Sequence, residues 1–104
     1  MDINELKKQS DRSFDIAVRK QNALEKAHSR MLVAHEGHLL KADAETINLV
    51  KNLSEDRQEF VILDINNNPV LVKDPVGLLD VLKSKNQEVL NSYHHTYQEF
   101  SKIR

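Results

Sequence analysis

Apolar side chains recur at every third or fourth position through the first 36 residues, which contain no glycine or proline. This spacing places them on one face of a helix and predicts a single long amphipathic helix over residues 2–36. Gly37 either ends this helix or weakens one turn of it, because glycine costs about 1 kcal/mol relative to alanine inside a helix. The apolar face comprises Phe14, Ala17, Val18, Leu24, Ala27, Met31, Leu32 and Ala34.

A second helical segment follows Asp43, whose carboxylate is suited to capping the first backbone N–H groups of a helix. The segment ends in the polar residues 54–59. If the helix continued through Gly37, residues 2–56 would form one rod roughly 80 Å long. We favour a helix that is broken near Gly37. The apolar positions of the second segment are Ala44, Ile47, Val50 and Leu53.

Residues 59–73 predict a β-hairpin. Two runs rich in β-branched and aromatic side chains flank the sequence Asn-Asn-Asn-Pro at residues 66–69. Asparagine tolerates the left-handed backbone of a tight turn, and Pro69 has no N–H to donate to a neighbouring strand. Two isolated strands are marginally stable in water, so this hairpin must pack on a helix or pair with another chain.

Asp74 and Pro75 predict the start of a long C-terminal helix, because aspartate caps exposed N–H groups and proline fits the first helical position. We expect this helix to run from Pro75 to about Lys102. Its core positions alternate by three and four over more than three heptads, as in a coiled-coil seam. This seam comprises Leu79, Leu82, Asn86, Val89, Tyr93, Thr96, Phe100 and Ile103.

The polar residue Asn86 within the seam would fix the register of the helix if a facing polar group paired with it. Leu90 and Tyr97 lie beside the seam and widen the apolar face, which favours a bundle over a two-stranded coil. The seam packs on the first helix of the same chain, on a second chain, or on both. The sequence leaves these alternatives open.

Together these elements predict a mainly α-helical protein with one small β-hairpin, arranged as a coiled-coil-like helical hairpin or bundle. We expect residues 1–104 to form a single elongated helical domain with the hairpin as an insertion. Hydrophobic residues make up 39% of the chain and charged residues 30%, against roughly 45–50% and a quarter in ordinary domains. A core this thin favours association with another chain.

Composition excludes several classes of function. The chain has no cysteine, so disulfides and thiolate chemistry are both absent. Its longest apolar runs, residues 31–34 and 60–63, are far shorter than the roughly 20 residues that span a bilayer. The N-terminal sequence lacks the apolar core of a secretion signal, so we expect a cytoplasmic protein. Because no phosphate-binding glycine loop, nucleophile elbow or zinc cluster is present, we predict that it is not an enzyme.

Histidines and basic side chains are the remaining candidates for chemistry. Glu25 and His28 have the Glu-x-x-His spacing of di-iron bundles, but such sites need a second motif and further glutamates, so we predict no metal and no other cofactor. Asp11 and Asp15 lie among the basic residues of the same helix, which favours a solvated face. The candidate contacts to nucleic-acid phosphates are Arg12, Arg19, Lys26 and Arg30.

Residues 60–100, FVILDINNNPVLVKDPVGLLDVLKSKNQEVLNSYHHTYQEF, resemble the C-terminal end of small proteins of large tailed bacteriophages. The shared features are a hairpin with an Asn-Pro-Val turn, an Asp-led helix start, and a helix with Asn and Tyr near its middle. The resemblance covers under half of the chain and carries over no functional residue. It implies a phage particle component or accessory protein, located in the virion or the host cytoplasm.

We therefore predict a non-enzymatic assembly or structural protein that acts through helix packing, as a homo-oligomer or bound to another protein. The alternative is a small regulatory inhibitor of a host or competitor protein, and a nucleic-acid-binding helix is less favoured. No membrane and no small-molecule substrate is expected. The predicted interface comprises Leu79, Leu82, Asn86, Val89, Tyr93, Phe100, Phe14, Leu24 and Met31.

Overall fold

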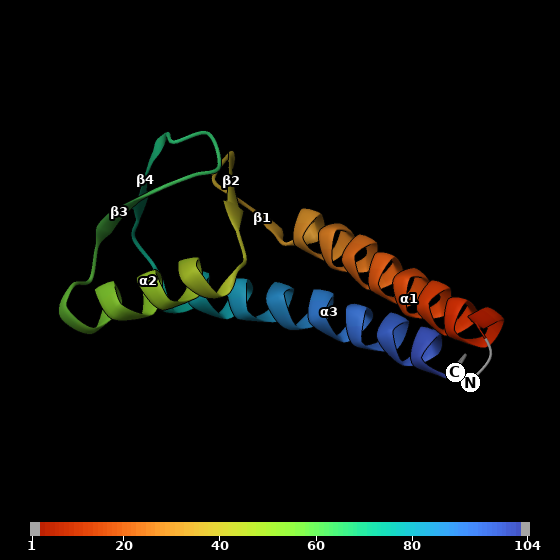
Figure 1. The fold of residues 1–104 in the computed structure, drawn as a ribbon. Coiled ribbons are helices and arrows are strands. Elements are labelled where there is room, and N and C mark those ends of the chain that lie inside the picture. Colours follow the sequence, from red (N-terminus) through yellow and green to blue (C-terminus); the bar gives the residue numbers. More distant parts are fainter. Residues whose placement is uncertain (1–2, 103–104) are drawn as a thin grey trace.

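The computed structural model describes residues 3–102, without the side chains of residues 4–7, 9, 10 and 101. The described residues form three helices, α1 (Ile3–Arg30), α2 (Ala44–Asp56) and α3 (Pro75–Ser101) (Figure 1). Two antiparallel hairpins pair β1 (Leu32–His35) with β2 (His38–Lys41) and β3 (Phe60–Leu63) with β4 (Pro69–Val72). The predicted fold class, mainly α with a small β element, is confirmed.

The molecule is elongated, with principal extents of 65 × 23 × 22 Å. Helices α1 and α3 run antiparallel and side by side, so that both chain ends lie at the same end of the molecule (Figure 1). Helix α2 packs on the N-terminal part of α3, and the two hairpins lie over this end of the molecule. No helix within residues 3–102 is both long enough and apolar enough to cross a bilayer.

The starts of α2 and α3 are set by aspartate caps, as the sequence predicts. Asp43 accepts a hydrogen bond from the N–H of Thr46 at 2.9 Å, and Asp74 accepts one from Gly77 at 3.1 Å. Pro75 occupies the start of α3, where its missing N–H costs nothing. Each cap satisfies an N–H group that has no partner inside its helix.

The N-terminal helix is shorter than predicted, and a second hairpin follows it. Helix α1 ends at Arg30, and the chain then forms β1 and β2. Glu36 and Gly37 join these strands with φ angles of 49° and 82°, the left-handed values that a two-residue hairpin turn requires. The prediction of a helix to residue 36 is therefore wrong, and the alternative of one rod over residues 2–56, which was not favoured, is excluded as well. The apolar run 31–34 fits a strand as well as a helix.

Gly37→Ala is expected to lower the free energy of unfolding by about 1 kcal/mol, because alanine is strained at positive φ. If a helix ran through this position, Gly37→Ala would instead raise the free energy of unfolding, since alanine stabilises a helix interior by about 1 kcal/mol relative to glycine. Urea unfolding of wild type and variant distinguishes the two. Gly37→Asn is the matched control and should retain most of the stability, and an alanine variant as stable as wild type would contradict the turn.

The second hairpin lies where the sequence places it. Strands β3 and β4 fall within the predicted residues 59–73. Asn67 has a φ of 63°, in the left-handed region that asparagine tolerates. The Oδ1 atom of Asp64 accepts the N–H groups of Asn66 at 2.8 Å and Asn68 at 2.9 Å, which closes the loop.

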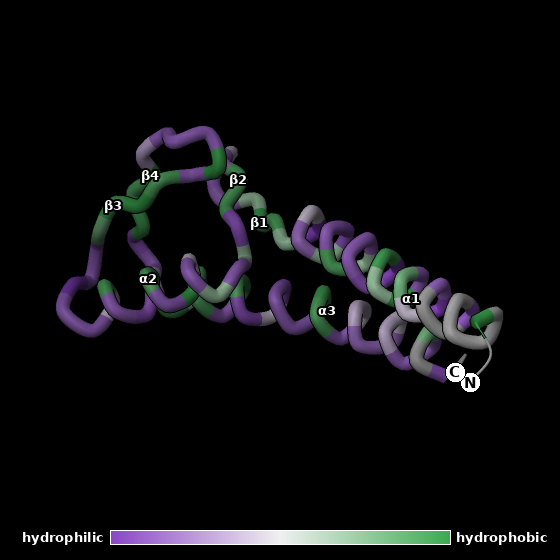
Figure 2. The backbone as a smooth tube through the Cα atoms, in the orientation of Figure 1, coloured by the Kyte–Doolittle hydropathy of each residue, from purple (hydrophilic) through white to green (hydrophobic). Residues whose placement is uncertain are grey.

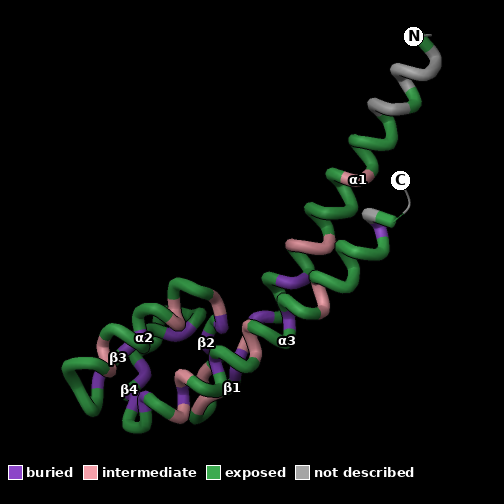
Figure 3. The backbone as a smooth tube through the Cα atoms, turned by 90° about the horizontal axis from the view of Figure 1, so that it is seen from below, coloured by how far each residue is buried: buried purple, intermediate pink, exposed green. Residues whose placement is uncertain are grey.

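The hydrophobic core lies where α2 and the inward faces of both hairpins meet α3. Figure 3 shows buried positions gathered in this region and along the contact between α1 and α3, whereas most of α1 is exposed. Figure 2 shows the hairpin strands as largely apolar segments. The most deeply buried large side chains are Leu40, Val50, Val72, Leu82 and Val89. Helix α3 therefore organises the fold, because every other helix packs against it.

Candidate functional site

The β3–β4 hairpin presents apolar side chains on its solvent face as well as on its core face. Successive side chains of a strand point to opposite faces. Phe60 and Ile62 point inward and are 5% and 4% exposed. Val61 and Leu63 point outward and are 57% and 61% exposed. Leu71 on the partner strand is also exposed, and we call Val61, Leu63 and Leu71 the outer hairpin face.

The register of the hairpin brings these side chains together. Val61 lies directly opposite Leu71, so the two form a cross-strand apolar pair in water. Ile65 and Leu39 add exposed apolar side chains next to this hairpin, because the N–H of Ile65 donates to the carbonyl of Leu39 at 3.0 Å. Exposed apolar groups gathered in this way make this hairpin a candidate surface for binding another protein.

Backbone groups at the same place are also available. Each sheet in the described part of the chain has two strands, so each strand has one edge outside its ladder, although the carbonyl of Leu39 on β2 is already bonded to the N–H of Ile65. Unpaired N–H and C=O groups along such an edge can pair with a strand of another protein. The outer hairpin face and these edges together define the candidate site.

A buried carboxylate connects the two hairpins under this site. His38 lies 2.8 Å from Asp64, measured from Nδ1 to Oδ2, and the Asp64 side chain is only 3% exposed. The hydrogen bond with His38 lowers the pKa of Asp64, burial opposes this shift, and the N–H groups of Asn68 and Asn66 support it. Because an ionised carboxylate only accepts hydrogen bonds, Nδ1 of His38 is the donor.

Asp64→Asn is expected to destabilise the protein at neutral pH and to flatten its acid sensitivity. The pKa of Asp64 lies below its ordinary value of 3.8. Its contribution to stability is therefore complete above that value and is lost as the pH falls through the lowered pKa. Thermal unfolding at about pH 7, 5 and 2.5 measures the difference. Asp80→Asn, at an exposed position of α3, is the matched control. Identical pH profiles for wild type and Asp64→Asn would contradict the contribution of the Asp64 carboxylate to stability.

The predicted helical interface is largely covered by the chain itself. Leu82 and Val89 are 0% exposed, and Phe100 and Met31 are 6% exposed. The half-buried members are Leu24, Leu79, Asn86 and Tyr93. Within the described residues, α1, α2 and the hairpins cover much of this face of α3, whereas Thr96 of the seam is exposed. An interface with a second chain at these positions stays a prediction. Ile103, the last seam position, lies outside the described residues.

Two members of the predicted interface, Asn86 and Phe14, lie in different environments. Asn86 donates from Nδ2 to the carbonyl of Ala42 at 2.9 Å, so its polar partner lies within the same chain. Phe14 remains 68% exposed, because α1 turns a different face toward α3, with Ala27 buried and Ile16 and Ala23 half-buried. A role of Phe14 in binding stays a prediction.

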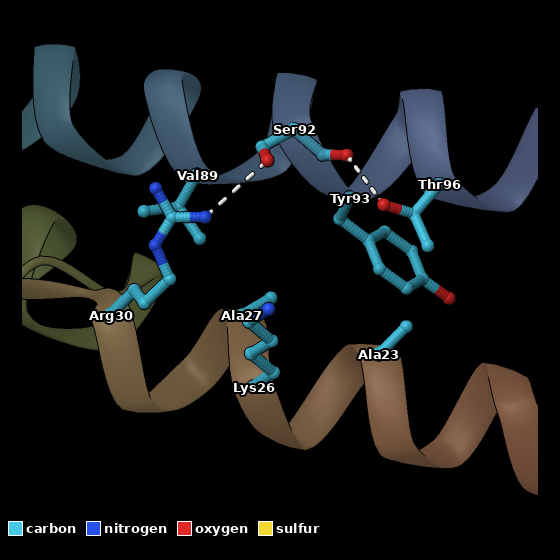
Figure 4. A pocket seen from close by; sticks show the side chains of 8 residues that line it. All are labelled: Ala23, Lys26, Ala27, Arg30, Val89, Ser92, Tyr93 and Thr96. Carbon is cyan, nitrogen blue, oxygen red and sulfur yellow. Dashed lines mark hydrogen bonds between the residues drawn. The ribbon is translucent and has the colours of Figure 1, made fainter.

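The predicted phosphate contacts divide into two pairs. The side chains of Arg12, Arg19, Lys26 and Arg30 are all exposed. Lys26 and Arg30 line a small cleft between α1 and α3, whereas Arg12 and Arg19 lie outside it (Figure 4). Glu25, weighed as a metal ligand, accepts a hydrogen bond from Gln21 at 3.1 Å. Among the described residues, no three side chains of metal-ligating type converge.

Sequence reasoning missed the outer hairpin face, although a signal was present. Residues 60–63 are four consecutive apolar residues, Phe-Val-Ile-Leu. A hairpin with one face on a core needs apolar side chains at alternate positions only. An uninterrupted apolar run in a two-stranded hairpin must therefore place Val61 and Leu63 in water.

These observations define a small helical protein with two hairpins and a surface suited to binding another protein. The chain matches the family model described as Transcription factor TFIIH complex subunit Tfb5 over residues 31–98, and it belongs to this family. The matched segment contains both hairpins, α2 and nearly all of α3, whereas α1 lies outside it. No curated protein and no solved structure matches the chain.

The family match corrects several predictions made from the sequence. The resemblance of residues 60–100 to phage proteins is wrong, because that segment belongs to a family of transcription-factor subunits. The phage particle component, the structural protein and the regulatory inhibitor are overturned with it. The expected location in a virion or in the host cytoplasm is not supported by the family match. The expectation of protein partners agrees with a family of complex subunits.

Proposed function

We propose that this chain is a non-catalytic subunit of a TFIIH complex and that the outer hairpin face holds it there. The exposure of Val61, Leu63 and Leu71 is the observation that carries this proposal. All three lie within residues 31–98, the segment shared with the family. A TFIIH subunit would act in the nucleus.

The energetics favour a protein partner with an apolar surface of its own. Fully burying a valine or leucine side chain contributes about 1.5–3 kcal/mol. Three such side chains form a compact apolar centre, the kind of cluster that dominates binding energy in protein interfaces. Strand edges beside them supply backbone hydrogen bonds that fix the orientation of the partner.

Co-expression of the full chain with each TFIIH subunit of the same organism tests the proposal. One subunit is expected to co-purify at a 1:1 ratio, with the mass of the complex measured by light scattering. A chain that stays alone, or that associates only with itself in the presence of every subunit, would overturn the proposal.

A further inference from the structure

A cleft lies between α1 and the C-terminal half of α3, away from the outer hairpin face. Its volume is about 110 Å³. Ala23 and Ala27 line it from α1, and their small side chains leave the space open (Figure 4). Since a water molecule occupies about 30 Å³ in the liquid, the cleft accommodates one compact ligand group rather than an extended chain.

Polar side chains face each other across this cleft. Lys26 and Arg30 lie one turn apart on α1, and Ser92 and Thr96 lie one turn apart on α3. Figure 4 shows the guanidinium of Arg30 reaching across to Ser92. The Nη1 atom of Arg30 donates to Oγ of Ser92 at 3.4 Å, a long hydrogen bond, and Thr96 donates to the carbonyl of Ser92 at 3.2 Å.

The charges of this cleft are not balanced. No carboxylate lines it. In the part of the chain that the structure describes, neither Lys26 nor Arg30 forms an ion pair. Like charges four residues apart on a helix repel each other, and a bound anion would relieve this repulsion.

We propose that the cleft binds a single phosphoryl group, as free phosphate or on a phosphorylated side chain of a partner protein. The planar guanidinium of Arg30 matches two phosphate oxygens, and Lys26 adds a compact positive charge. The hydroxyl of Ser92 rotates freely and can donate to a third oxygen. The group therefore bridges α1 to α3.

Titration of the full chain with inorganic phosphate, followed by amide chemical shifts, tests the site. Phosphate is expected to shift residues 26–30 and 92–96 and to raise the thermal midpoint, whereas sodium chloride at equal ionic strength is not. The double variant Lys26→Gln and Arg30→Gln should bind about tenfold more weakly or worse, because charged hydrogen bonds are lost. Arg12→Gln with Arg19→Gln is the control, since it removes the same charge from the same helix outside the cleft, and its affinity should stay within about twofold of wild type.

Further binding measurements distinguish the two sources of the phosphoryl group, free phosphate and a phosphorylated partner. A phosphoserine peptide that binds more tightly than phosphate, with no binding by the unphosphorylated peptide, would support a phosphorylated partner, and equal affinities would support free phosphate. If the glutamine variant loses its helical circular dichroism, Ser92→Ala replaces it and should weaken binding several-fold. Absence of a phosphate-specific shift overturns the site. If an oligonucleotide binds and its affinity falls equally in both double variants, the site is overturned in favour of the basic side chains of α1 as a whole, Arg12, Arg19, Lys26 and Arg30.

Discussion

Leu82→Asp is expected to unfold the chain. Leu82 is 0% exposed and belongs to the core between α3, α2 and the hairpins. Truncating a buried leucine costs about 2–5 kcal/mol, and the new carboxylate adds the cost of an unpaired charge in an apolar site. The sum is comparable to the whole stability of a small domain, about 5–15 kcal/mol. Far-UV circular dichroism and urea unfolding measure the loss.

Val76→Asp is the matched control for this substitution. Val76 is 77% exposed in the first turn of α3, where a negative charge is favourable. Its free energy of unfolding should stay within about 0.5 kcal/mol of wild type. If Leu82→Asp remained folded and only reduced the mass of an oligomer, Leu82 would belong to an interface between chains, and its place in the core of one chain would be contradicted.

Val61→Lys combined with Leu71→Glu is expected to weaken binding to the TFIIH subunit that co-purifies by about a hundredfold. The pair removes two apolar side chains from the outer hairpin face, each of which contributes about 1.5–3 kcal/mol when buried. The fold should survive, because both positions are exposed and the opposite charges face each other across the strands. Calorimetric titration gives the affinity.

Val76→Lys with Val81→Glu is the control for binding. These residues are also exposed valines, 77% and 49%, but they lie on α3. The control variant should bind as wild type does. Equal losses in the two double variants would show that the change in surface charge, and not the outer hairpin face, governs binding.

Local signals in the sequence predicted local structure well. Asp43, Asp74 and Pro75 mark helix starts because a cap acts on N–H groups two or three residues away. The turn at Asn67 was predicted for a similar reason, since the preference of asparagine for left-handed backbone is a property of that residue alone. Such features need no knowledge of what packs on them.

Features that depend on distant residues were not predicted. Residues 32–35 become a strand because Val33 and Leu40 pair across the Gly37 turn and share the core, which the apolar run alone does not show. The period of the α3 seam identified part of the covered face, because Leu82, Val89 and Phe100 are buried. It missed the burial of Leu78, and Thr96 of the seam is exposed. Periodicity does not say which chain supplies the cover, and here the same chain does.

Although α1 and α3 lie in close contact, they bury unequal amounts of side chain, so stability differs along the molecule. Among the side chains that the structure describes, α1 contributes Ala27 alone to the buried core, whereas α3 contributes several. An element that buries little opens at small free energy, and the rest of the protein need not unfold with it. Amide hydrogens of α1 (residues 3–30) are then expected to exchange with solvent long before those around Leu82, so that α1 separates from α3 while the rest of the fold stays intact.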